Sequence, residues 1–237
     1  MSKKLDFVND YISNYVSDNF PELSRFKIEI NPDNLYYQTS INGYKRVLYM
    51  GLGHLTYPNE VIVNGGFHCW TQVTIVEDML YDLIVKHGLH RQQLFPTIWF
   101  SEFTIKNYNE IWDSFRQFNG YDLSIDKEKL DALCQHYKEV IVKHFIPFWE
   151  KFSDIQYINN EIVDKVDQMN LADYFGVGLM SFKKLIIMRI CRNPKYHTYK
   201  EWLLNIYKEK EDEMKNDTEW NAKYSLLKEL IEILETK

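Results

Sequence analysis

The residues whose chemistry could matter most lie in one short segment, Gly65-Gly66-Phe67-His68-Cys69-Trp70. A cysteine is a nucleophile only as a thiolate, and a nearby histidine is a common group for removing its proton. His68 is adjacent to Cys69, but neighbouring side chains of a strand point to opposite faces of the sheet. A base for Cys69 would therefore have to come from a distant segment, such as His144 or His197.

The Cys69-Trp70 pair is similar to the nucleophile region of papain-like thiol hydrolases, but the flanking cysteine and small residues of that pattern are absent. A helix N-terminus would lower the pKa of such a cysteine, whereas the nearest helix-start signal here is Thr74, five residues later. A buried structural cysteine in a strand is the better interpretation of Cys69.

Four residues nevertheless define a candidate pocket: His54, His68, Cys69 and Trp70. His54 follows Gly51-Leu52-Gly53, but a GxG without the strand-turn-helix continuation is a weak signal for phosphate binding. An enzyme or small-molecule binder using these residues would have its pocket between the sheet and the C-terminal helices, with thiol chemistry at Cys69 as its activity.

No other pattern assigns a reaction. His136 and His144 lie about two helical turns apart on one expected helix, too far to share an ion. The chain has no P-loop, GxSxG, HExxH or EF-hand sequence. We therefore assign no catalytic, cofactor-binding or metal-binding residue and expect no cofactor.

Composition indicates a globular protein that stays in the cytoplasm. Of the 237 residues, 45% are hydrophobic and 26% are charged, as in an ordinary globular protein. The net charge is −6 and basic residues are interleaved with acidic ones, so we expect no nucleic-acid partner. Cys69, Cys134 and Cys191 form no CxxC pair and favour reduced thiols. The N-terminus has no secretory signal and no window reaches the length of a membrane span, so we expect no membrane association.

Aromatic residues make up 16% of the chain, with 17 Tyr, 14 Phe and 6 Trp. Two explanations remain open. The rings can fill a large core, with amphipathic tyrosines at its margin, or they can form an aromatic contact surface for another protein.

The first half of the chain predicts a helix followed by an antiparallel sheet. Apolar spacing of three and four predicts a helix over Leu5 to Leu23, ended or bent by Pro21, and alternation predicts a strand from Phe26 to Ile30. Asn42-Gly43 predicts a type I′ hairpin, because both of its central positions need positive φ. The hairpin register pairs Ile41 with Tyr44, Tyr37 with Leu48 and Leu35 with Met50 on one face, and Tyr36 with Tyr49 and Gln38 with Val47 on the other.

Further elements complete the first half. They are a strand pair, Glu60–Val63 and Phe67–Trp70, around Asn64-Gly65-Gly66; a helix opened by a capping box at Thr74 and Glu77 and closed at Gly88; a strand from Ile98 to Ile105; and a short helix from Asn107 to Phe118.

From Asp126 onward the spacing of apolar residues predicts helices only. Pro147 bends or ends the first of them. A capping box at Ser153 opens the next, another helix runs from Leu171 to Cys191, and a capping box at Thr198 opens a further one. The predicted fold class is α+β, with an N-terminal antiparallel sheet flanked by helices and an all-helical C-terminal half. We divide the chain into a sheet subdomain, 1–125, and a helical subdomain, 126–237.

The order of segments resembles a loose group of uncharacterised bacterial α+β proteins known as domains of unknown function. The resemblance rests on Arg25-Phe26-Lys27-Ile28, the Asn42-Gly43 hairpin and the run from His144 to Phe152. Some such small acidic proteins are immunity partners of bacterial toxins. The resemblance and the composition together imply a non-catalytic, cytoplasmic binding protein, immunity- or regulator-like, whose partner is another protein.

Overall fold

The computed structural model describes residues 3–27, 34–55, 60–89, 96–175 and 179–236, without the side chains of 53–55 and 64–66. The chain forms two compact units. Unit 1 comprises Met1–Thr71 and Trp99–Lys151, and unit 2 comprises Gln72–Ile98 and Phe152–Lys237. These units group the chain differently from our division at residue 125, because the helices up to Lys151 belong with the sheet and Gln72–Ile98 belongs with the C-terminal helices.

Unit 1 contains most of the sheet and the helices beside it. Its elements are α1 (Lys3–Asn19), β1 (Ser24–Phe26), β2 (Leu35–Ile41), β3 (Tyr44–Leu55), most of β4 (Glu60–Val73), the end of β5 (Ile98–Trp99), α3 (Tyr108–Ser114), the 3₁₀ turn η1 (Phe115–Phe118), α4 (Lys127–Val140), the π-helix η2 (Ile141–Phe145) and α5 (Ile146–Phe152). The strands are ordered β1-β2-β3-β4-β5. The α+β class is confirmed, and the described residues beyond β5 form only helices and turns.

The predicted hairpin is confirmed in turn and in register. Asn42 and Gly43 have φ values of 50° and 83°, as a type I′ turn requires. Ile41 pairs with Tyr44, Tyr37 with Leu48, Leu35 with Met50, Tyr36 with Tyr49 and Gln38 with Val47.

The other strand boundaries differ from those we predicted. The expected pair around Asn64-Gly65-Gly66 is wrong, because Glu60–Val73 forms one continuous strand, β4, beside the long strand β3. The strand predicted from Ile98 to Ile105 is limited to β5, because turns begin at Ser101. The strand predicted from Phe26 to Ile30 is present only as β1, Ser24–Phe26, and residues 28–30 lie outside the described residues.

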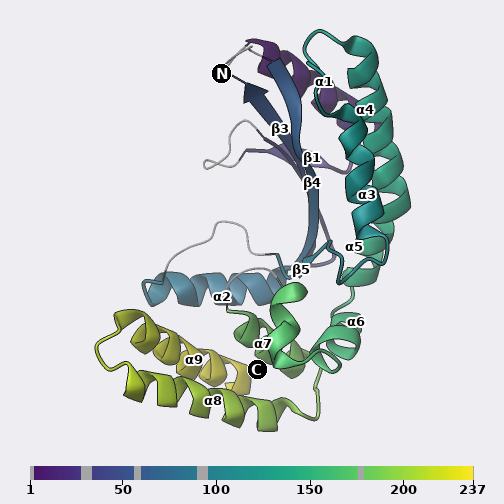
Figure 1. Cartoon of the computed structure of the whole chain (residues 1–237). Helices are drawn as coiled ribbons and strands as arrows, with labels where there is room; N and C mark the ends of the chain where they lie inside the picture. The colour runs from purple at the N-terminus through teal and green to yellow at the C-terminus, as the bar shows by residue number, and fades with distance from the viewer. Residues whose placement is uncertain (1–2, 28–33, 56–59, 90–95, 176–178, 237) are drawn as a thin grey trace. The chain divides into compact units, whose positions relative to one another are not determined.

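The helices of unit 1 lie along one face of its sheet (Figure 1). Tyr37, on β2, is fully buried beneath α1, and its hydroxyl lies 3.2 Å from Ser13 Oγ. Phe67, on the same face of β4, packs against Phe115 and Phe145, with ring centres 4.9 Å apart in each case. This face of the sheet therefore carries the core of unit 1.

The helix that contains Pro147 continues past the proline to Phe152. Asp126 caps α4, accepting a hydrogen bond from Lys129 N at 3.0 Å. The helix widens into the π-helix η2 and then continues as α5 to Phe152. Because proline has no N–H and its ring crowds the preceding turn, the wider turn before Pro147 lets the helix pass it.

Unit 2 is mainly helical. Its elements are α2 (Thr74–Lys86), α6 (Ile155–Ile158), the π-helix η3 (Asn159–Val163), the 3₁₀-helix η4 (Gln168–Asp173), α7 (Met180–Ile190), α8 (Tyr196–Glu213) and α9 (Thr218–Thr236). The buried helix α7 contacts α2, α8, α9, η3 and η4. Among the described residues, no helix is long and apolar enough to cross a membrane.

The capping boxes predicted in this unit are wrong in detail. The helix α6 begins after Asp154, whose carboxylate accepts from Gln156 N at 2.8 Å, so Asp154 rather than Ser153 is the cap. Thr198 lies inside α8, which starts at Tyr196. The predicted helix from Leu171 to Cys191 is divided into η4 and α7, with residues 176–178 outside the described part of the chain.

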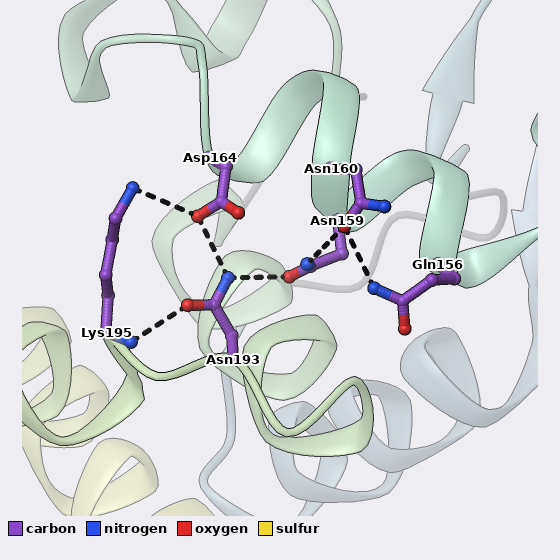
Figure 2. A network of polar contacts seen from close by, with 6 residues as sticks. All are labelled: Gln156, Asn159, Asn160, Asp164, Asn193 and Lys195. Carbon is purple, nitrogen blue, oxygen red and sulfur yellow. Dashed lines mark hydrogen bonds and ion pairs between the residues drawn. The ribbon is translucent and has the colours of Figure 1, made fainter.

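Figure 2 shows a polar network that joins η3 to the turn between α7 and α8. Asn193 Nδ2 donates to Asn159 Oδ1 at 2.9 Å and to Asp164 Oδ1 at 3.0 Å. Asn193 Oδ1 accepts from Lys195 N at 2.9 Å. Asn193 and Asn159 are buried, so these hydrogen bonds replace the water that both amides have lost.

Candidate functional site

A row of aromatic rings crosses the sheet in unit 1, with one ring from each strand. The row consists of Phe26, Tyr36, Tyr49, His68 and Trp99, from β1 to β5 in order. Neighbouring ring centres are 5.7, 4.9, 5.3 and 6.2 Å apart along this order. Such distances are typical of interacting aromatic pairs, so the five rings form a continuous surface that we call the aromatic row.

The aromatic row forms because of the sheet register. Tyr36 lies directly opposite both Phe26 and Tyr49, and its neighbour Tyr37 points to the helix-covered face. Side chains directly opposite on adjacent strands are close enough to stack. The row therefore lies on the sheet face opposite the one that carries the core of unit 1.

The aromatic row is partly exposed and uncharged. Tyr36, the second ring of the row, is 6% exposed, whereas Phe26, Tyr49 and Trp99 are half-buried and His68 is the most exposed of the five. Neighbouring rings partly shield both side chains from water, and this desolvation raises the pKa of Tyr49 and lowers the pKa of His68. Both side chains are therefore mainly neutral at pH 7, which suits a surface that binds through ring faces.

Of the four residues of the predicted pocket, His68 and Trp70 lie on one face of β4, where both pack against Trp99, and Cys69 points to the other face. His68 belongs to the aromatic row, and Trp70 lies beside it, with its ring centre 5.3 Å from that of Trp99. Cys69 is 0% exposed, and burial raises the pKa of its thiol well above the ordinary value. The side chain of His54 lies outside the described residues.

Trp70 carries two polar groups with different surroundings. Its backbone carbonyl accepts a hydrogen bond from Trp149 Nε1 at 3.1 Å, whereas its own indole nitrogen is buried without a hydrogen-bond partner among the described residues. An unpaired buried donor costs about 1–3 kcal/mol.

Unit 1 also has a polar groove of about 240 Å³ between α3 and the helix formed by α4 and η2. His136 and His144 both line this groove, about two helical turns apart. Ser114 Oγ lies 2.8 Å from His136 Nε2 and donates its single proton to the carbonyl of Ile111 at 2.6 Å. His136 must then donate to the serine, so this pair is not arranged as a nucleophile and its base.

No metal site gathers around these histidines. Within the described part of the chain, no three His, Cys, Asp or Glu side chains are placed to hold a metal ion. Burial lowers the pKa of both His136 and His144.

Unit 2 contains a buried ion pair that the sequence did not predict. Lys183 Nζ, on α7, lies 3.1 Å from Glu77 Oε1 on α2, and both side chains are less than one tenth exposed. Thr97 Oγ1 donates to the same carboxylate oxygen at 2.5 Å, and Lys183 also donates to the carbonyl of Pro96 at 2.8 Å. Burial raises the pKa of Glu77 and lowers that of Lys183.

This ion pair shows why the capping box at Thr74 is wrong. The N-cap position of α2 is Val73, with no side-chain cap, and its backbone N–H donates to Thr97 Oγ1 at 2.8 Å. Glu77 is directed inward to Lys183 instead of back to the helix start. The pattern of residues matched a local cap, but a partner far away in sequence takes the carboxylate.

Sequence reasoning found part of the aromatic row. The predicted hairpin register already paired Tyr36 with Tyr49. The alternation of side chains along a strand placed His68 and Cys69 on different faces of the sheet. Trp99 was missed, because nothing in its local sequence indicates that β5 pairs beside β4. The signal in the sequence is the presence of an aromatic residue on every strand, at positions that lie next to one another across the sheet.

No matching protein provides a precedent for the aromatic row. Comparison with known protein families, with curated proteins and with solved structures found no match, so the assignment of this site depends on its geometry.

Proposed function

We propose that this protein is a non-catalytic binding protein that recognises another protein through the aromatic row. The observation that carries the proposal is a continuous set of five rings on the sheet face opposite the core. Tyrosine and tryptophan are enriched at protein interfaces, because they bury a large area with few rotatable bonds. Four of the five rings keep exposed surface available for contact.

The chemistry of the partner follows from charge. The chain has a net charge of −6, which attracts a basic protein at long range. The faces of Tyr49 and Trp99 can bind arginine or lysine side chains by cation–π interaction. The partner that fits best therefore presents apolar and basic side chains together.

The resemblance to bacterial α+β proteins adds a biological setting to this proposal. An immunity- or regulator-like protein in the bacterial cytoplasm would bind a toxin or a regulatory target without chemistry of its own. Cys69 supports the absence of thiol catalysis, because its fully buried thiol has a raised pKa and His68 points to the other face of β4.

Site-specific photocrosslinking in cells of the source organism tests the proposal. A photoreactive phenylalanine analogue replaces Tyr49 or His68, and a third variant carries it at Tyr121, an exposed aromatic residue of unit 1 outside the row. We expect one defined crosslinked protein from positions 49 and 68 and none from position 121. That protein is then purified, and its affinity is measured for the wild type, Tyr49→Ala, His68→Ala and the control Tyr121→Ala.

The expected result is a loss of affinity of about tenfold or more in each row variant, the size of an interface hot spot, and no change in the control. Circular dichroism and thermal melting establish that the variants fold. Equal crosslinking at all three positions, or unchanged affinity in both row variants, would overturn the proposal.

A further inference from the structure

Unit 2 has a surface groove that is separate from the aromatic row. It has a volume of about 450 Å³ and lies between α2 and α9. The residues that line it are Ile75, Asp78, Met79, Asp82, Leu83 and Lys86 from α2, and Glu229 and Ile233 from α9. We call it the α2–α9 groove.

The apolar part of the groove follows helical spacing. Ile75, Met79 and Leu83 follow one another at intervals of four residues on α2 and form one ridge along just over two turns, about 12 Å long. Ile75 is 50% exposed, while Leu83 is buried at the base and Ile233 contributes from α9. A ridge of this length and spacing matches the apolar face of a third helix laid along the groove.

The charges of the described residues that line the groove do not balance. Lys86 is the one basic residue among the described residues that line the groove. Its Nζ lies 2.5 Å from Glu229 Oε1, so its charge is already neutralised by α9. His87 Nε2 approaches the other oxygen of Glu229 at 2.9 Å. Hydrogen bonds from Lys86 and then His87 hold the pKa of Glu229 below its ordinary value.

Two aspartates remain without such a partner. Asp78 and Asp82 are four residues apart on the exposed side of α2, and neither forms an ion pair with any described residue. Like charges at this spacing repel and weaken a helix slightly. Asp82 precedes Lys86 by one turn, but the lysine pairs with Glu229, so Lys86 does not relieve the repulsion between the two aspartates.

We propose that the α2–α9 groove binds a basic amphipathic helix of a partner protein, whose apolar face covers Ile75 and Met79 and whose lysine or arginine side chains reach Asp78 and Asp82. The charge complementarity selects this occupant: an acidic helix would add to the repulsion along α2, and the chain as a whole is acidic. This site lies in unit 2 and does not depend on the aromatic row, which lies in unit 1.

Binding of a designed peptide to the full chain tests the inference. The probe is an amphipathic helical peptide of about four turns, with leucines along one face and lysines flanking them. The control peptide has glutamate in place of each lysine. Fluorescence anisotropy measures affinity at low and high salt, and hydrogen exchange maps the peptide on the protein.

We expect the lysine peptide to bind, to protect α2 and α9 from exchange, and to bind more weakly at high salt. The Asp78→Asn/Asp82→Asn variant should lose about fivefold to tenfold in affinity, as two partly exposed ion pairs would give, and Ile75→Ser should weaken binding at both salt concentrations. The matched control Glu209→Gln/Asp212→Asn, which removes two acids from α8, should bind as the wild type does.

Several outcomes would overturn the inference. They are absence of binding, equal affinity for the two peptides, unchanged affinity in Asp78→Asn/Asp82→Asn, or protection that excludes α2 and α9. Sedimentation showing a dimer that Ile75→Ser dissociates would assign the groove to a second copy of this chain and would also overturn it. None of these outcomes bears on crosslinking from Tyr49 or His68, so the two proposals fail separately.

Discussion

The core of unit 1 and the core of unit 2 contain different kinds of buried side chain. Around Phe67 in unit 1 the neighbours are rings, with the centres of Phe100, Trp112, Phe115 and Phe145 between 4.9 and 5.9 Å away. In unit 2 the buried set includes a lysine, a glutamate and two asparagines, each hydrogen-bonded or ion-paired to a partner distant in sequence.

The difference teaches where each unit obtains its specificity. Packed rings contribute through contact area, which depends little on pH. Buried charges are costly to desolvate and are tolerated only with the right partner, so they favour one arrangement of helices over its alternatives and respond to pH. Unit 1 should therefore fail when volume is lost, and unit 2 when a partner is lost.

The largest effect should come from removing a ring in unit 1. Phe67→Ala deletes the centre of the aromatic cluster and should lower the free energy of unfolding by about 3–5 kcal/mol. Urea denaturation at pH 5 and pH 8 should give the same loss, because no charge is involved. A loss below about 1 kcal/mol, or one that changes strongly with pH, would break the contrast between the units.

A slightly smaller effect, dependent on pH, should follow from Lys183→Met in unit 2. The substitution leaves Glu77 buried without its cation, at a cost of about 3 kcal/mol near neutral pH, because protonation of Glu77 limits the penalty. Without Lys183 the folded-state pKa of Glu77, already raised by burial, rises further above its unfolded value of about 4.5.

The sign of this pH dependence is definite. Above pH 4.5 the folded variant retains a proton that the unfolded chain releases, so stability falls as pH rises through this window. The difference between Lys183→Met and the wild type should thus be larger at pH 8 than at pH 5. Glu77→Gln/Lys183→Met should recover much of the loss, and a double variant as unstable as the single one would refute the buried-charge explanation.

The smallest effect should come from Asp164→Asn, at the solvent side of the network in Figure 2. The side-chain hydrogen bond from Asn193, followed by that from Lys195, lowers the pKa of Asp164 below 3.8. Its stabilising contribution is present above pH 3.8 and is lost as pH falls through the lowered folded-state value.

We expect Asp164→Asn to cost about 1 kcal/mol or less at pH 7, because this carboxylate is partly exposed. The difference from the wild type should shrink when unfolding is measured near pH 3. A constant difference across this range would show that the asparagine network, rather than the charge of Asp164, determines the local stability.

The features that sequence reasoning predicted correctly depend on neighbours in the chain. The Asn42-Gly43 turn fixes the register of β2 and β3 by itself, and the 3.6-residue spacing gives the type of each long helix. Asn64-Gly65-Gly66 has the same turn-forming residues yet lies inside β4, because the neighbouring strand β3 is long enough to hold it extended.

The features that sequence reasoning missed depend on distant partners. Glu77 matched a capping box until Lys183 and Thr97 were seen to bind it, and Trp99 has no local sign that it completes the aromatic row. The groove between α2 and α9 brings together residues separated by most of unit 2. Local patterns cannot rank such competitors, because they contain no information on which helices pack together.

The chain passes from unit 1 to unit 2 and back before either is complete, since Gln72–Ile98 is inserted between the two segments of unit 1. Neither unit can be obtained by a single truncation, and a version of unit 1 alone would need a linker joining Thr71 to Trp99. During synthesis, α2 leaves the ribosome long before α7 does, so the carboxylate of Glu77 stays solvated until Lys183 has been synthesised. Unit 2 should therefore become protected from proteolysis only after its last helices have been translated.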